Sequence, residues 1–191
     1  IAILKSSSLR SVVVCDGFRV CPQATQTKTD GSVQIWASPR HLVGSIESSF
    51  HPKLCIIKFK NSLRICIGTG NFITDDWERY SNAFWVKEFP LVQEQSASNS
   101  PFANYLEAFC AACLGPSWLG ICEYLELDIR KYWMDSGHFS LVASLPSPVI
   151  PESPIKLGLE RIEEVLMSAP PVRPYTLKSS KITDVTSSIG S

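Results

Sequence analysis

The stretch HPKLCIIKFKNSLRICIGTGN, from His51 to Asn71, decides the fold of this chain. Residues 53–59 and 63–68 are rich in isoleucine, leucine and cysteine, and the short polar connection 60–62 separates them. Two such runs joined by a short polar connection are typical of a β-hairpin whose strands are largely buried. A hairpin brings the residues before its first strand next to those after its second strand. We therefore expect His51 and Asn71 to lie close together.

The two ends of this hairpin carry the chemistry of a phosphate site. His51 and Lys53 occupy positions i and i+2, which point to the same face of a sheet. The second strand ends in Gly-Thr-Gly-Asn71, where glycine lets the backbone approach a ligand and the amide can donate to an oxyanion. An imidazole, an ammonium and an amide at one sheet edge can attack, neutralise and orient a phosphodiester.

The hairpin lies within a longer series of strands and helices. Short apolar runs bounded by turn residues predict further strands at 11–15, 33–37, 83–86 and 139–145. Apolar residues at helical spacing predict helices from Pro101, from Pro116-Ser117 to just before Ser136, and at 155–167. On the last helix, four charged residues are expected to face water: Glu160, Arg161, Glu163 and Glu164. The fold class is therefore α/β, with one mixed β-sheet flanked by helices.

Composition excludes several classes of protein. The 191 residues are 45% hydrophobic and 19% charged, which excludes a disordered chain, and 18 basic side chains balance 18 acidic ones, which excludes a polycation. Residues 1–64 nevertheless carry nine Lys or Arg and three Asp or Glu, an excess that suits an anionic partner. The uncharged stretch 108–122 is interrupted by Gly115-Pro116 and is too short to span a bilayer, so no membrane partner is expected.

The seven cysteines are odd in number and spread through apolar segments, which argues against a disulfide scaffold and favours a reducing compartment, cytosolic or nuclear. Cys110, Cys113 and Cys122 are of the residue type that binds zinc. However, the first two fall within an apolar helical pattern, and no fourth ligand has a fitting spacing. We expect core thiols, and no metal or other cofactor.

The hairpin motif resembles the half-site of the phospholipase D superfamily, a His-x-Lys pair followed by an Asp and then by Gly-Ser-x-Asn. Here Lys58 occupies the position of that Asp, and the spacing to Asn71 is three residues longer. Both departures are features of the tyrosyl-DNA phosphodiesterase family, whose signature is His-Lys-Asn. Further residues similar to that family are Leu63-Arg64, Asp76-Trp77, Trp85 and Phe89-Pro90. The resemblance covers about residues 10–191.

The resemblance implies one half of a pseudo-two-fold enzyme in which each half supplies a His-Lys-Asn set. His51 would attack the 3′-phosphate of a DNA end joined to tyrosine and form a phosphohistidine, with Lys53 and Asn71 at the same phosphate. The histidine of the second half would protonate the leaving phenolate. No second His-x-Lys follows in this chain, so the general acid would lie in a missing C-terminal half.

The same resemblance implies the domain organisation and further substrate contacts. Residues 1–180, including the proline-rich crossover 146–174, would form the N-terminal half-domain, and residues 181–191 the start of a truncated second half. Asn82 stands where the family has a glutamine that reaches the histidine of the other half, and is one methylene shorter. The residues that match a phosphate-binding segment of the family are Ser187, Ser188, Gly190 and Ser191. Asp76, between a strand end and a helical turn, is expected to be a helix cap.

The favoured interpretation is a metal-independent DNA-repair phosphodiesterase of the nucleus. Its partners would be single-stranded DNA or a 3′ end with a tyrosyl adduct, and the missing half of the same protein. One alternative is another phosphodiesterase of the superfamily, and another is a noncatalytic DNA-binding remnant. A second His-x-Lys downstream would favour an enzyme, and a stop codon after Ser191 would favour the remnant. The fragment alone is expected to be inactive.

Overall fold

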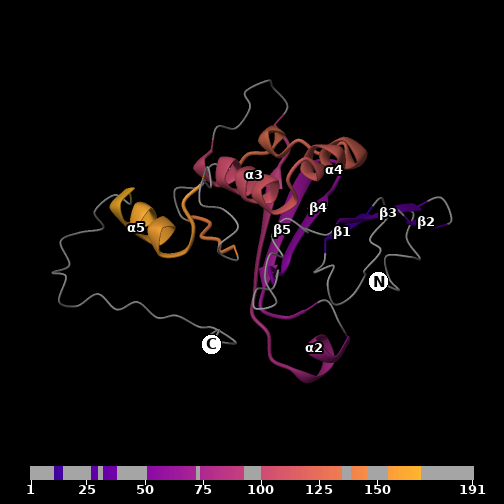
Figure 1. Cartoon of the computed structure of the whole chain (residues 1–191), viewed down its shortest axis with the longest axis horizontal. Coiled ribbons are helices and arrows are strands. Elements are labelled where there is room, and N and C mark those ends of the chain that lie inside the picture. Colours follow the sequence, from indigo (N-terminus) through magenta and orange to yellow (C-terminus); the bar gives the residue numbers. More distant parts are fainter. Residues whose placement is uncertain are drawn as a thin grey trace.

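The computed structural model describes residues 51–71, 74–92, 100–134, 139–145 and 155–168, and the backbone of the strands at 11–14, 27–29 and 32–37. Within these residues the fold is mixed α/β (Figure 1). The described strands form two three-stranded sheets.

The central sheet contains the hairpin. It is antiparallel, in the order β4-β5-β6, with bounds Leu54–Lys58, Ser62–Gly68 and Phe84–Pro90. Leu54 pairs with Ile67, which confirms the hairpin predicted from the sequence. β5 lies between the other two strands and its alternate apolar residues are the most buried, as the two-residue period of a strand requires.

The second sheet comprises β1 (Ser11–Val14), β2 (Thr27–Thr29) and β3 (Ser32–Ala37) in the order β1-β3-β2. β1 is parallel to β3 and β2 is antiparallel to it, so this sheet is mixed. The strands predicted at 11–15 and 33–37 are confirmed. The prediction of a single mixed sheet is wrong for the described residues, because no ladder of backbone hydrogen bonds joins the two sheets there.

Helices α3 (Pro101–Leu114) and α4 (Ser117–Leu125) lie together at one end of the central strands (Figure 1). α3 begins where sequence predicts, because the Ser100 hydroxyl accepts a hydrogen bond from the backbone N of Ala103 at 3.1 Å and a proline follows. It ends at Gly115, whose φ of 56° suits glycine.

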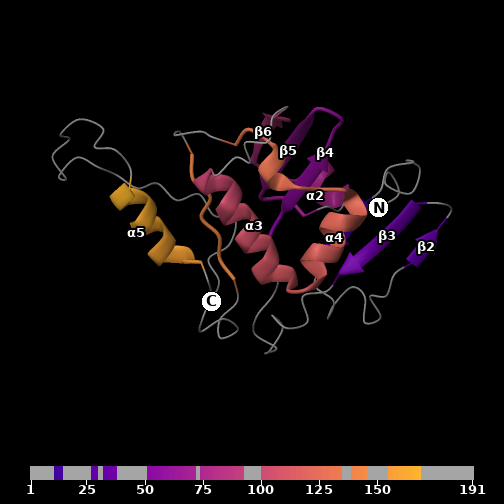
Figure 2. The same cartoon turned by 90° about the horizontal axis from the view of Figure 1, so that it is seen from above.

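The two helices meet at a bend of 119° (Figure 2). Among the described residues no single helix is long and apolar enough to cross a membrane, although this bent pair has the necessary combined length and composition. Both helices contribute buried residues to the core.

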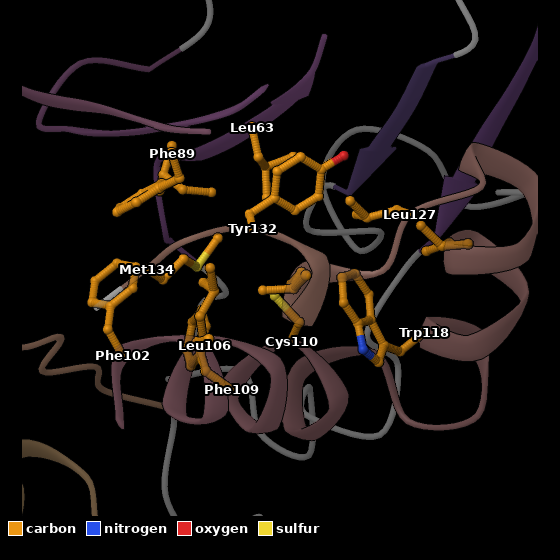
Figure 3. Close-up of a cluster of buried hydrophobic side chains, with 14 of the residues drawn as sticks. Leu63, Phe89, Phe102, Leu106, Phe109, Cys110, Trp118, Leu127, Tyr132 and Met134 are labelled. Atoms are coloured by element: carbon orange, nitrogen blue, oxygen red, sulfur yellow. The ribbon is translucent and has the colours of Figure 1, made fainter. Parts of the chain in front are cut away.

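The hydrophobic core lies between these helices and the central sheet, as Figure 3 shows. Leu106 of α3 and Leu63 and Ile65 of β5 are completely buried. Phe102 packs on Phe89 of β6, with ring centroids 5.7 Å apart. Each such side chain contributes about 1.5–3 kcal/mol by leaving water, so this cluster holds one face of the sheet against α3 and α4.

α4 is shorter than predicted. The apolar stripe that runs on to Ile129 predicts one helix up to Ser136, but α4 ends at Leu125. Glu126 has a φ of 51°, in the left-handed region, which stops a right-handed helix. The 3₁₀ turn Ile129–Lys131 then returns Ile129 to the core, which explains why the apolar spacing continues.

Lys58, at the end of β4, binds the backbone carbonyls at the C-terminus of α4. Its Nζ donates hydrogen bonds to the backbone oxygens of Leu125 at 3.1 Å and Glu126 at 2.7 Å. The last carbonyls of a helix lack partners within the helix, and its C-terminus carries a partial negative charge, so a cation is favourable there. The position that is acidic in the phospholipase D pattern therefore serves here to hold a helix against the sheet.

Replacing Lys58 by methionine is expected to lower the free energy of unfolding by about 0.3–1 kcal/mol, the usual value of a cation at a helix C-terminus. Urea denaturation followed by circular dichroism measures this change. Lys60→Met, in the exposed turn two residues further on, is the matched control. Equal losses in the two variants would show that the contact with α4 contributes nothing specific.

Residues 139–145 form no strand, contrary to the prediction. Their backbone groups bond elsewhere: Ala143 N donates to the Tyr105 hydroxyl at 3.3 Å, and Ala143 O accepts from Gly158 N at 2.9 Å. Since buried backbone groups need partners but not necessarily strand partners, these contacts replace a sheet ladder.

Helix α5 (Gly158–Ser168) confirms the helix predicted at 155–167, with a later start. The prediction that Arg161 faces water is wrong, because its side chain is only 13% exposed. The guanidinium lies 4.2 Å from the ring centroid of Tyr105, and its Nε donates to the Leu141 carbonyl at 3.2 Å. Arginine can cover an aromatic ring and bond a carbonyl at once, which draws it into the interface. The other three residues are at least partly exposed, as predicted: Glu160, Glu163 and Glu164.

Candidate active site

His51, Lys53 and Asn71 lie at the end of the central sheet where helix α2 (Thr74–Arg79) follows β5. Figure 1 shows α2 at the opposite end of the strands from α3 and α4. The hairpin register continues beyond the named strands, because Gly68 N donates to Lys53 O at 3.0 Å. Extended by two residues, it places His51 opposite Gly70, beside Asn71. The hairpin therefore places both ends of the motif at the same end of the central sheet.

Lys53 faces away from the helical core. Leu54 packs against the core, and successive residues of a strand alternate between faces, so Lys53 points to the other side of the sheet. Gly68 and Phe84 lie on that side as well, since Gly68 is the partner of Phe84 in the ladder and is opposite Lys53. The Lys53 side chain is thus separated from the packing that stabilises the fold.

Two glycines of the motif lie directly against side chains of the protein itself, where a larger residue would not fit. A Cβ on Gly68 would lie 2.1 Å from a carbon of the Phe84 ring, and one on Gly70 would lie 2.8 Å from Cγ of Asn82. Both distances are far below van der Waals contact. The sequence predicts glycines for the approach of a ligand; the structure shows that they first make room for Phe84 and Asn82.

His51 and Lys53 interact electrostatically. Partial burial lowers the pKa of His51 below its ordinary value of 6.5, and the positive charge of Lys53 lowers it further. Lys53 Nζ donates to the backbone oxygen of His51 at 3.0 Å. Partial burial also lowers the pKa of Lys53, whereas the carboxylate of Asp76 opposes this change. At neutral pH the imidazole is therefore mostly unprotonated, the form in which it can act as a nucleophile.

Asn71 is held by the start of α2. Its backbone N and its side-chain Nδ2 both donate to Oδ2 of Asp76, at 2.7 and 2.8 Å. Its backbone oxygen accepts from the indole Nε1 of Trp77 at 2.8 Å. The Trp77 ring stacks on Phe84, with centroids 4.7 Å apart, so the same aromatic pair flanks Asn71 and Gly68. An amide fixed in this way can present its second N–H to a phosphate oxygen.

Compared with models of known protein families, residues 25–191 match tyrosyl-DNA phosphodiesterase. The chain belongs to the tyrosyl-DNA phosphodiesterase family. No curated protein matches it. The resemblance recognised in the hairpin motif is thereby confirmed, and the matched region includes the whole central sheet and helices α2 to α5.

One substrate contact predicted from the tyrosyl-DNA phosphodiesterase pattern lies in the described structure. Asn82 is part-buried, its Oδ1 accepts from the Thr69 hydroxyl at 3.0 Å, and its Nδ2 donates to the backbone oxygen of Asp76 at 2.7 Å. Both ends of this amide are thus used inside the loop, and its contact with a second half stays a prediction. The other predicted contacts lie outside the described residues: Ser187, Ser188, Gly190 and Ser191.

Asp76 makes hydrogen bonds to Asn71 and Asn82 that the tyrosyl-DNA phosphodiesterase motif does not reveal. It is the third residue of α2, where a carboxylate commonly reaches back to an N–H group preceding the helix. The helix cap expected at Asp76 is not found, because Asp76 lies inside α2 and its carboxylate accepts from the backbone N of Asn71, which precedes the helix by three residues. The sequence does not predict the bond to the Asn71 side chain, because spacing along the chain does not show which way a side chain turns.

The cysteines expected to be core thiols lie where predicted. Cys110 and Cys113 are buried in the core. Burial raises the pKa of Cys113 to about 12 and that of Cys122 to about 11, whereas metal binding requires thiolates. Among the described residues no three His, Cys, Asp or Glu side chains are grouped to hold a metal ion.

Proposed function

We propose that this protein is a DNA-repair phosphodiesterase that hydrolyses 3′-phosphotyrosyl and related 3′-blocked DNA ends, with His51 as its nucleophile. The observation that carries the proposal is the position of His51, Lys53 and Asn71 at one end of a hairpin inside the tyrosyl-DNA phosphodiesterase match. We propose the nucleus as its compartment.

The proposed reaction has two displacements at phosphorus. The neutral imidazole of His51 forms a bond to phosphorus, the bond to the phenolic oxygen of tyrosine breaks, and a second histidine protonates the phenolate. Water then attacks the phosphohistidine and gives a proton to the second histidine, which frees His51 and leaves a 3′-phosphate on the DNA. Lys53 offsets the charge that develops on the phosphate oxygens, and Asn71 donates a hydrogen bond to one of them.

A second half-domain is part of this proposal, since the reaction needs a second histidine. The apolar residues Leu159, Leu166 and Met167 of α5 are 82%, 60% and 83% exposed. A helix with such an exposed apolar face is commonly covered by another part of its protein, which supports a continuation of the fold. The residues predicted to begin that half, 181–191, lie outside the described structure.

The test uses the full natural protein and a single-stranded oligonucleotide that carries a 3′-phosphotyrosyl group, in EDTA. The expected product is the same oligonucleotide with a 3′-phosphate. Cleavage of only a small diester such as bis-p-nitrophenyl phosphate would favour another phosphodiesterase, and DNA binding without any cleavage would favour the noncatalytic remnant.

The rate of adduct formation is expected to fall on acidification through an apparent pKa below 6.5. A group whose pKa is lowered by burial and by a neighbouring cation stays neutral to lower pH, and it loses nucleophilicity only below that value. NMR titration of the His51 ring checks this assignment. In Lys53→Met the His51 pKa should rise towards 6.5 but remain below it, because burial is the larger cause. An unchanged His51 pKa in that variant would contradict the coupling.

A further inference from the structure

We propose that Asp76 is a positioning residue of this site, which sets the orientation of the Asn71 amide and braces the loop that carries it. This inference rests on the proposed function, because positioning matters where Asn71 binds a phosphate. Asp76 is not part of the His-Lys-Asn signature, and it matches the family only as a residue that flanks this signature.

The side chain of Asp76 settles which way the Asn71 amide points. A carboxylate accepts hydrogen bonds and donates none, so the atom of the Asn71 side chain that faces it must be the nitrogen. Oδ2 of Asp76 accepts hydrogen bonds from both the backbone N and the side-chain Nδ2 of Asn71, at 2.7 and 2.8 Å. Two bonds to one oxygen fix the backbone and the side chain of Asn71 together. One amide hydrogen is used in this contact, and the second remains to donate.

The backbone of Asp76 holds the other side of the loop. Its carbonyl oxygen accepts from Nδ2 of Asn82 at 2.7 Å, and Oδ1 of Asn82 accepts from the hydroxyl of Thr69 at 3.0 Å. Thr69 directly precedes the Gly70-Asn71 pair. The loop after β5 is therefore closed by a chain of bonds that runs from Thr69 through Asn82 and Asp76 to Asn71.

Asp76 also acts on Lys53, the cation of the site. Its negative charge raises the pKa of Lys53 against the effect of partial burial. Removal of this charge should therefore make Lys53 lose its proton at lower pH. Lys53 in turn lowers the pKa of His51, so the charge of Asp76 acts on the cation that keeps the imidazole neutral.

A simple capping role and a positioning role predict different results. A cap stabilises α2, whereas a positioning residue changes kcat through Asn71. Asp75→Asn is the matched control, because Asp75 lies in the same helical turn and pairs with Arg79 on the surface at 3.5 Å.

The experiment measures kcat, KM and thermal unfolding of the full natural protein with the 3′-phosphotyrosyl oligonucleotide. Asp76→Asn has the same shape as Asp76, and it is expected to lower kcat by about tenfold to a hundredfold with little change in KM, the cost of a misplaced group at a reacting centre. Asp76→Glu should recover part of the rate, and Asp75→Asn should stay within about twofold of wild type.

A double-mutant cycle decides whether Asp76 acts through Asn71. In the Asn71→Ala background, Asp76→Asn should lower kcat by no more than about threefold, because the group that it positions is already absent. The same factor in both backgrounds would overturn the proposal, and so would a loss of thermal stability with unchanged kcat.

NMR separates this inference from the proposed function. In Asp76→Asn the side-chain amide of Asn71 should exchange its hydrogens faster, and the Lys53 pKa should fall. If the wild-type protein cleaves no phosphotyrosyl substrate, the proposed function fails, while these two readings still decide whether Asp76 positions Asn71. Unchanged amide exchange and an unchanged Lys53 pKa would refute the positioning role even in an active enzyme.

Discussion

His51→Ala is expected to abolish the covalent adduct and the turnover of a 3′-phosphotyrosyl oligonucleotide. The substitution removes the nitrogen that forms the bond to phosphorus, and no neighbouring group can replace it: Lys53 carries a proton at neutral pH, and the Asn71 amide is not nucleophilic. The measurement is a quench of the full natural protein with radiolabelled substrate and EDTA in dodecyl sulfate at alkaline pH, where the phosphohistidine bond is stable, followed by electrophoresis under denaturing conditions.

Peptide mapping of the trapped wild-type protein provides the control. The label should reside on the peptide that contains His51 and be absent from the peptides that contain His41 and His138. An adduct that persists in His51→Ala, or turnover that requires a divalent metal ion, would show that the mechanism proposed for this site is wrong.

Lys53→Ala is expected to slow adduct formation by on the order of a hundredfold or more, by analogy with the loss of one preorganised oxyanion donor. The variant loses the charge that offsets the developing negative charge on phosphate. It also removes the cation that interacts electrostatically with the carboxylate of Asp76. Single-turnover kinetics at saturating enzyme separates this effect on the chemical step from weaker binding.

Lys87→Ala is the matched control for this variant, because Lys87 is an exposed cation on β6 of the same sheet. Its rate should stay within about twofold of wild type, as for other surface substitutions. A similar slowing in both variants would mean that general electrostatic attraction of DNA, rather than a local contact with the phosphate, accounts for the role of Lys53.

The hairpin and its reactive ends are the part of the molecule that could be predicted from sequence. Their determinants are local: two apolar runs, a three-residue polar connection and the pairing register that follows from them. The same holds for α3, which begins at the Ser100-Pro101 signal and ends at Gly115. In each case neighbouring residues carry all the information that the element needs.

The end of α4 and the backbone conformation of residues 139–145 could not be predicted from neighbouring residues in the sequence. The apolar stripe that continues to Ile129 is the same for one long helix and for a helix followed by a 3₁₀ turn. The choice depends on contacts between distant residues, such as Lys58 with the carbonyl of Leu125, 67 positions apart. Tertiary hydrogen bonds likewise override the strand propensity of 139–145, because Tyr105 and α5 provide its partners.

The sequence by itself determined the family, the α/β class and the hairpin that carries the three predicted site residues, because a short motif and two apolar runs depend on spacing along the chain. Only the tertiary structure decided that Asp76 turns back to hold Asn71, that Asn82 is engaged within its loop, and that Arg161 is covered rather than solvated. The physical reason is common to all three. Spacing along the chain sets which face of an element a residue occupies, whereas the partner that a polar side chain finds depends on which other elements are packed beside it.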